Sequence, residues 1–91
     1  MPVKYLLTGA SGHLGGNIVR ELLSRGKDVR ALVVPGDRLA PHIPAAAEIV
    51  EGDVLDADSL RKFFKVPSGT ETIVIHCAGV VSTVWNYVKL V

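Results

Sequence analysis

Residues 8–16 of the chain read TGASGHLGG, directly after the apolar run that begins at Val3. Three glycines at three-residue spacing, Gly9, Gly12 and Gly15, are typical of a turn between a buried strand and a helix. One glycine of such a turn adopts a positive φ, one lets the backbone approach a pyrophosphate, and one lets the helix pack closely on the strand. Unpaired N–H groups and the positive end of the helix dipole then face the phosphates. The stretch therefore predicts a dinucleotide site, with an ordinary strand–helix turn as the simpler alternative.

Size and composition limit the classes of protein that the chain can represent. It has 91 residues, 48% of them hydrophobic and 21% charged, which indicates one small globular domain. A formal net charge of +1 gives no electrostatic reason to expect nucleic acid or an anionic membrane as a partner. Cys77 is the single cysteine, so the sequence offers neither an intrachain disulfide nor a thiolate zinc cluster. Without a secretory leader or an apolar run of about 20 residues, we expect a cytoplasmic protein that does not span a membrane.

Hydrophobic periodicity divides the chain into alternating strands and helices. The valine-rich and apolar runs predict strands over residues 3–8, 28–34, 47–50 and 72–77. Apolar residues at helical spacing from Leu14 predict a helix that ends at Arg25, with Gly26 as its C-terminal cap. A second helix, capped by Asp56 or Asp58, should turn Phe63 and Phe64 inward.

This alternation predicts an α/β fold with a parallel sheet of strand order 3-2-1-4 and helices on both faces. Ligands should then bind at the carboxyl ends of strands one and four. The prolines and glycine of residues 35–44 predict a loop with one helical turn. Residues 80–91 have apolar positions at helical spacing, but their valine content leaves a strand or loop open.

Two further landmarks accompany the glycine turn. Asp53-Val54 follows the third predicted strand, and the stretch from His76 to Gly79 reads HCAG after the fourth. With them the chain resembles the short-chain dehydrogenase/reductase superfamily over essentially its whole length. The Gly-x-x-Gly-x-x-Gly spacing is the form used by its extended or atypical branch, which includes NAD-dependent epimerases, dehydratases and dihydroflavonol-type reductases. The resemblance implies a Rossmann-type fold.

The resemblance also implies which residues meet the cofactor. The pyrophosphate would be approached by Gly9, Gly12 and Gly15, by the backbone of His13 and Leu14, and by the Ser11 hydroxyl.

On the adenosine side, the resemblance implies that Asp53 accepts a hydrogen bond from the adenine amino group while the Val54 backbone meets the ring edge. Alternatively, Asp53 only ends a strand and begins a turn. Ala78 and Gly79 would flank the adenosine ribose, where a larger residue would collide with the cofactor.

The choice between NAD and NADP depends on the end of the second strand. An acidic residue that holds the ribose 2′-hydroxyl would fall near Val33 or Val34, and neither can do so. Asp37 and Arg38 follow in the loop, and an arginine can meet a 2′-phosphate by charge-assisted hydrogen bonds. The presence of Arg38 therefore favours NADP over NAD as the predicted cofactor.

Catalytic residues are expected elsewhere. In the superfamily that the chain resembles, the proton is transferred by a tyrosine that a lysine four residues later activates. In this sequence Tyr87 and Lys89 are only two residues apart, which does not place them on one face of a helix. We therefore expect residues 1–91 to be a single N-terminal NAD(P)-binding segment, inactive alone, of a longer oxidoreductase or epimerase that acts on a carbonyl or sugar-nucleotide type substrate. The alternative is a non-catalytic NAD(P)-sensing regulatory protein of the same fold. A P-loop hydrolase is disfavoured because no Gly-Lys-Ser or Gly-Lys-Thr follows the glycines.

The remaining reactive side chains have simpler interpretations. His13 is expected to be a loop residue near the cofactor entrance rather than a catalytic base. His76 is expected to be a core histidine with its hydrogen bonds satisfied, and Cys77 a small buried apolar residue. An unpaired edge at the fourth strand predicts a homo-oligomer, formed by edge pairing or by exchange of residues 80–91.

Overall fold

The computed structural model describes residues 2–77. Within them the strands β1 (Val3–Thr8), β2 (Asp28–Val33), β3 (Glu48–Glu51) and β4 (Glu71–His76) form one parallel sheet of order β3-β2-β1-β4. The α/β fold and the strand order predicted from the sequence are confirmed. Strand β2 ends one residue before the predicted limit, because the proline that follows Val34 disfavours continuation of regular structure there.

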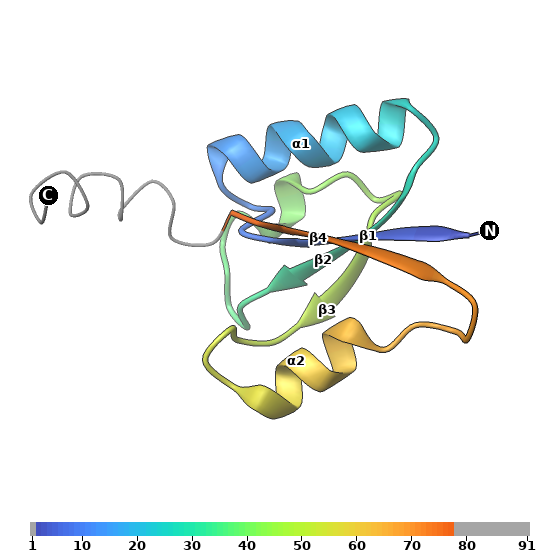
Figure 1. The fold of residues 1–91 in the computed structure, drawn as a ribbon. Coiled ribbons are helices and arrows are strands. Elements are labelled where there is room, and N and C mark those ends of the chain that lie inside the picture. The colour runs from blue at the N-terminus through green and yellow to red at the C-terminus, as the bar shows by residue number, and fades with distance from the viewer. Residues whose placement is uncertain (1, 78–91) are drawn as a thin grey trace, which may run out of the picture.

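Helices cover both faces of this sheet. Figure 1 shows α1 (His13–Ser24) and the short 3₁₀ helix η1 (Ala40–His42) on one face and α2 (Ala57–Phe64) on the other. The single helical turn expected in the loop after β2 is thus η1. The predicted ribose contacts of Ala78 and Gly79 and the predicted secondary structure of residues 80–91 concern residues outside the described part of the chain.

Helix α1 ends as its sequence predicts. Gly26 has a φ of +73°, a conformation that a side chain disfavours. Its N–H donates to the carbonyl of Leu23 at 3.0 Å, and the N–H of Lys27 donates to that of Leu22 at 3.0 Å. This pair of bonds is a Schellman motif, which satisfies carbonyls that a helix end otherwise leaves unpaired. Gly26 thereby turns the chain back into β2.

Two apolar clusters hold the layers together. On the α1 face, Leu7 of β1 packs with Val19 of α1 and with Val29 of β2. On the α2 face, Phe63 is fully buried against Leu6 and Leu32. The prediction that Phe64 also faces inward is wrong: its side chain is 44% exposed, because adjacent helical residues are turned by about 100° from each other.

Strand β4 is the exposed edge of the described sheet. Among residues 2–77 its neighbour is β1, and its opposite edge carries no strand. Ile73 and Val74 point to opposite faces and are 37% and 48% exposed. The strands of a parallel sheet are normally covered on both faces, so β4 is an apolar surface that the described residues leave open.

A buried charge cluster fixes α2 to the sheet. The Arg30 guanidinium on β2 is only 10% exposed, and it donates to the carbonyls of Phe63 at 2.7 Å and Lys65 at 2.6 Å. Its Nε donates to Glu48 on β3 at 3.0 Å, and Lys4 Nζ lies 2.8 Å from the same carboxylate. Hydrogen bonds from Lys4 and Arg30 hold the pKa of Glu48 below its usual range. No role was predicted for Arg30 or Glu48 from the sequence, and Lys4, expected to be a solvated charge, has a side chain only 14% exposed because it pairs with Glu48 and Asp28.

Candidate functional site

The glycine turn links β1 to α1 through a tight reversal at Gly9. This glycine has a φ of +71°, and its carbonyl accepts the N–H of Gly12 at 3.1 Å. Gly12 is the extended N-cap residue of α1, with φ of −77° and ψ of 173°, and its carbonyl accepts the N–H of Gly16 at 2.9 Å. The turn therefore delivers the start of α1 to the carboxyl end of β1.

The helix passes β1 at a distance that excludes a side chain at Gly15. An ideal Cβ built there would lie 2.0 Å from the carbonyl oxygen of Gly9 and 2.7 Å from its carbonyl carbon. At Gly12 the nearest such atom, the same Gly9 oxygen, is 3.4 Å away, which is ordinary van der Waals contact. The fold thus requires glycine at position 15, whereas at Gly12 the protein itself leaves room for a methyl group.

The N-terminus of α1 is suited to an anion. Within the described residues no side chain caps it, and its first turn carries no carboxylate. The first N–H groups of a helix have no intrahelical acceptor, and the helix dipole places partial positive charge beside them. His13 and Leu14 are exposed at this end, so their N–H groups lie where a phosphate could accept from them.

Ser11 connects the glycine turn to the loop after β2. Its Oγ donates to Asp37 at 2.6 Å, and the other carboxylate oxygen of Asp37 accepts the N–H of Leu39 at 2.9 Å. These two hydrogen bonds hold the pKa of Asp37 below its usual range. Arg38, which the sequence analysis offered for a 2′-phosphate, is exposed beside them. Sequence reasoning did not join Ser11 to Asp37, because the two are 26 residues apart.

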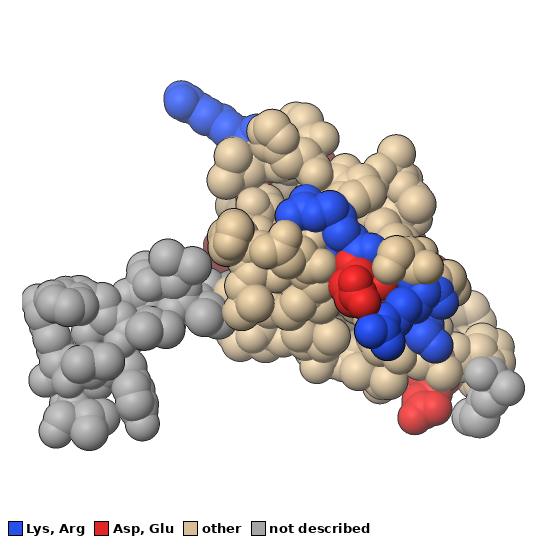
Figure 2. Space-filling model, turned by 90° about the horizontal axis from the view of Figure 1, so that it is seen from above, with Lys and Arg blue, Asp and Glu red and all other residues tan. Residues whose placement is uncertain are grey.

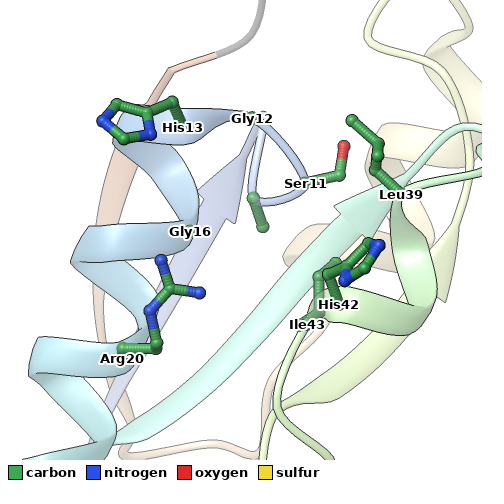
Figure 3. Close-up of a pocket in the computed structure, with 9 residues that line it drawn as sticks. Ser11, Gly12, His13, Gly16, Arg20, Leu39, His42 and Ile43 are labelled. Atoms are coloured by element: carbon green, nitrogen blue, oxygen red, sulfur yellow. The ribbon is translucent and has the colours of Figure 1, made fainter.

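A pocket of about 190 Å³ opens beside this turn, between α1 and η1 (Figure 3). The lining residues come from the glycine turn, from the first two turns of α1 and from η1 with its flanks: Ala10, Ser11, Gly12, His13, Gly16, Arg20, Leu39, His42 and Ile43. Figure 3 shows the Arg20 side chain folded back along α1 toward Gly16. Neither Arg20 nor His42 was assigned a role from the sequence. Arg20 lies one helical turn after Gly16 on α1, whereas His42 comes from the separate helix η1.

Asp53 and Val54 follow β3 at the same edge of the sheet. The N–H of Gly52 donates to the carbonyl of Val33 at 2.8 Å, which keeps the end of β3 beside the end of β2. Asp53 is half-buried, and its Oδ1 accepts the N–H of Leu55 at 2.9 Å, so the residue does form a turn. Val54 is 36% exposed and accessible to a ligand. Contact of either residue with adenine stays a prediction.

Thr8 and His76 are the last residues of β1 and β4, and their side chains contact each other. Thr8 Oγ1 and His76 Nδ1 are 2.6 Å apart, and the N–H of Cys77 donates to the same Oγ1 at 3.1 Å. Cys77 is buried as expected. His76 is exposed rather than part of the core, because β4 is an edge strand whose last residue faces outward; its Nδ1 is nevertheless engaged by Thr8. The sequence could not reveal this pair, whose members are 68 residues apart.

Charge is mixed on the face that α1 covers. Figure 2 shows basic and acidic side chains in contact with one another there, a further basic side chain apart from them, and no continuous basic patch. Within residues 2–77 the structure contains no group of three or more His, Cys, Asp or Glu side chains that could hold a metal ion. None of the described helices is both long and apolar enough to cross a bilayer.

Known proteins share this arrangement. A crystal structure of a UDP-glucose 4-epimerase superposes with a TM-score of 0.72 at 22% identity, over 92% of this chain and 27% of that one. A UDP-glucose 4-epimerase of Streptomyces lividans is 34% identical over 65 residues, which are 71% of this chain and 20% of that protein. Sterol demethylase protein B of Methylococcus capsulatus is 46% identical over 56 residues, which are 62% of this chain and 17% of that protein.

The chain therefore spans about a fifth of the length of these curated relatives. The family model described as the NAD dependent epimerase/dehydratase family matches residues 5–89. Because this match includes the glycine turn and every strand and helix described above except the first two residues of β1, the chain belongs to the NAD dependent epimerase/dehydratase family.

Proposed function

We propose that this chain binds the pyrophosphate and adenosine parts of NAD(P). The observation that carries the proposal is the glycine turn, where a bare N-cap at Gly12 leaves the first N–H groups of α1 accessible. Gly9 and Gly15 shape the turn, and the N–H groups of His13 and Leu14 would donate to the phosphates. The negative ligand would supply the cap that the described side chains do not.

The adenosine would extend from this turn across the carboxyl ends of β2, β3 and β4. Ser11 lies at the turn with its hydroxyl on Asp37, and Asp53 and Val54 lie at the end of β3. We assign the adenine contact to these last two residues and the ribose contact to Ala78 and Gly79, which follow the described end of β4. Parallel strands place their carboxyl ends at one edge, where ligands of open α/β sheets bind.

In this proposal the chain is the cofactor-binding segment of a larger protein, and that larger protein catalyses the reaction. The family and its epimerase members support NAD(P)-dependent oxidoreductase or epimerase chemistry on a small molecule, with a carbonyl or sugar-nucleotide type substrate as the finer assignment. The printed residues contain no Tyr-x-x-x-Lys pair, and they match only about a fifth of the length of the relatives. We therefore assign cofactor binding to this segment and proton transfer to residues outside it, and we expect no turnover from this segment alone.

Gly12→Ala is expected to weaken dinucleotide binding by about tenfold or more while leaving the fold intact. A methyl group here meets only the Gly9 oxygen, at 3.4 Å, but it would project where the pyrophosphate approaches. Isothermal titration with NAD and NADP measures the affinity. Thermal unfolding without ligand provides the control, since the variant should unfold at nearly the wild-type temperature.

Two outcomes would contradict this assignment. Undiminished affinity in Gly12→Ala would mean that the ligand does not contact the turn. Failure of wild-type protein to bind either dinucleotide, and to gain thermal stability from them, would refute the proposed function itself, because a ligand at 100 times its Kd should stabilise the folded state by about 2.7 kcal/mol.

We also propose that copies of the chain associate through β4. Within residues 2–77 no strand pairs with the outer edge of β4, and this edge and the exposure of Ile73 and Val74 support the proposal. Light scattering coupled to size exclusion is expected to give a mass of at least two chains at tens of micromolar. Ile73→Lys places a charge on the exposed edge strand and should shift the measured mass toward that of one chain. If the wild-type protein already has the mass of one chain, the proposed association is refuted.

A further inference from the structure

Arg20 has a neutral partner, unlike the cations that form ion pairs among the described residues. Ion pairs within residues 2–77 engage Lys4, Arg25, Arg30 and Arg61. Arg20 instead donates to a neutral acceptor, the amide oxygen of Asn17, at 2.6 Å. Its positive charge is therefore not compensated by a neighbouring carboxylate.

The Arg20 guanidinium lies beside Gly16, and both residues line the pocket. An ideal Cβ at Gly16 would lie 3.6 Å from both terminal nitrogens of Arg20, so the guanidinium rests directly over the glycine. Figure 3 shows the side chain running along α1 from its own turn toward the glycine turn. The charge thus lies about one helical turn closer to the N-terminus of α1 than the residue's own backbone does.

The polar lining of the pocket suits an anion. It consists of Ser11, His13, Arg20 and His42, and no carboxylate is among the lining residues. Leu39 and Ile43 supply apolar wall, which strengthens the field of a charge beside it. A guanidinium presents a planar fork of donors that matches the oxygens of a phosphate, and an imidazole can donate one more hydrogen bond.

The pocket is continuous with the glycine turn, because Ser11 and Gly12 belong to both. If the turn holds a pyrophosphate, as proposed above, an anion in the pocket lies within reach of the same ligand. NADP differs from NAD by one additional phosphate, a monoester on its adenosine ribose. We propose that this pocket binds the 2′-phosphate of NADP, with Arg20 and His42 as the contacting side chains, an inference that rests on the proposed function.

Two neighbouring charges bear on this assignment. Arg38 is exposed and does not line the pocket, so the contact expected of it from the sequence is assigned to Arg20. Asp37 lies across Ser11, with one oxygen bound by Ser11 Oγ and the other by the Leu39 N–H. These bonds hold the carboxylate out of the lining, but its charge still opposes an anion, so Asp37→Asn is expected to raise the affinity for NADP.

The test is a comparison of NADP and NAD affinities by isothermal titration of the whole chain. We expect the wild type to bind NADP more tightly than NAD. Arg20→Gln should weaken NADP binding by about tenfold or more and change NAD binding by less than about twofold, because the variant loses a charge-assisted hydrogen bond to a phosphate that only NADP carries. Lys62→Gln, on α2 at the opposite face, removes the same charge and should leave both affinities unchanged. Arg38→Gln tests the contact expected from the sequence and should weaken NADP binding less than Arg20→Gln does.

Several results would overturn the inference while leaving the proposed function in place. These are tighter binding of NAD by the wild type, an equal loss of both affinities in Arg20→Gln, or a loss of NADP affinity in Arg38→Gln but not in Arg20→Gln. The source of the phosphate is tested with 2′,5′-ADP and inorganic phosphate as competitors. Competition by 2′,5′-ADP alone is expected; equal competition by inorganic phosphate would assign the pocket to the free ion. If neither dinucleotide binds, the proposed function fails and this inference with it.

Discussion

Gly15→Ala is expected to destabilise the folded chain by about 3–5 kcal/mol, a large part of the stability of a domain this small. The added Cβ would lie 2.0 Å from the Gly9 oxygen, 2.7 Å from the Gly9 carbonyl carbon and 3.0 Å from the Ala10 Cα. All three are backbone atoms, so no side-chain rotation relieves the contact. Relief requires that α1 move away from β1, which would separate Val19 from Leu7 in the core.

The sign of this effect distinguishes close approach from helix propensity. In an open helical position, alanine is more favourable than glycine by about 1 kcal/mol, so Gly15→Ala would stabilise α1 if space were available. Thermal and urea unfolding followed by circular dichroism measure the change. Gly12→Ala is the matched control, because its nearest contact is 3.4 Å and its φ of −77° suits any residue. Equal stabilities of the two variants would contradict the described approach of helix and strand.

Arg30→Met is expected to cost about 2–4 kcal/mol of unfolding free energy. Methionine preserves the apolar stem of the side chain but donates no hydrogen bond. The carbonyls of Phe63 and Lys65, at the end of α2, would then lose their charged donor, and Glu48 would keep only Lys4 as a cation. Because the arginine side chain is only 10% exposed, water cannot readily replace these bonds.

Arg61→Met provides the comparison on the same helix. Arg61 pairs with Asp58 on the surface, where the two side chains are 77% and 84% exposed, and such pairs contribute about 0–1 kcal/mol. Urea denaturation of both variants should therefore separate them by at least about 1 kcal/mol. Similar free energies of unfolding would mean that Arg30 does not hold α2 on the sheet.

Local patterns in the sequence were sufficient to predict the fold. Strand β1 begins and ends where its apolar run predicts, Gly26 terminates α1, and the side chain of Asp56 accepts the N–H of Asp58 at the start of α2. Each of these features depends on residues a few positions apart, so a short window of sequence contains the information. The strand order follows because parallel strands joined by helices have few allowed arrangements.

The candidate site was predictable only in part, for the same reason. The three glycines predict a turn whose geometry is local. The His76 prediction failed because exposure depends on what the rest of the fold covers. Contacts between residues that are distant in the sequence cannot be predicted from a short window, because the window contains only one of the two partners.

The sequence by itself determined the order of strands and helices, the position of the glycine turn, the end of α1 and the cap that begins α2, because backbone preferences and hydrophobic spacing act over a few residues. Only the tertiary structure decided that Ser11 meets Asp37, that Thr8 meets His76, and that Arg30 reaches the end of α2. These contacts join residues separated by 26, 68 and 33 positions, and they exist because the parallel sheet brings distant segments to one edge or face. The same packing brings Leu39, His42 and Ile43 opposite α1 and so forms the pocket that Arg20 lines.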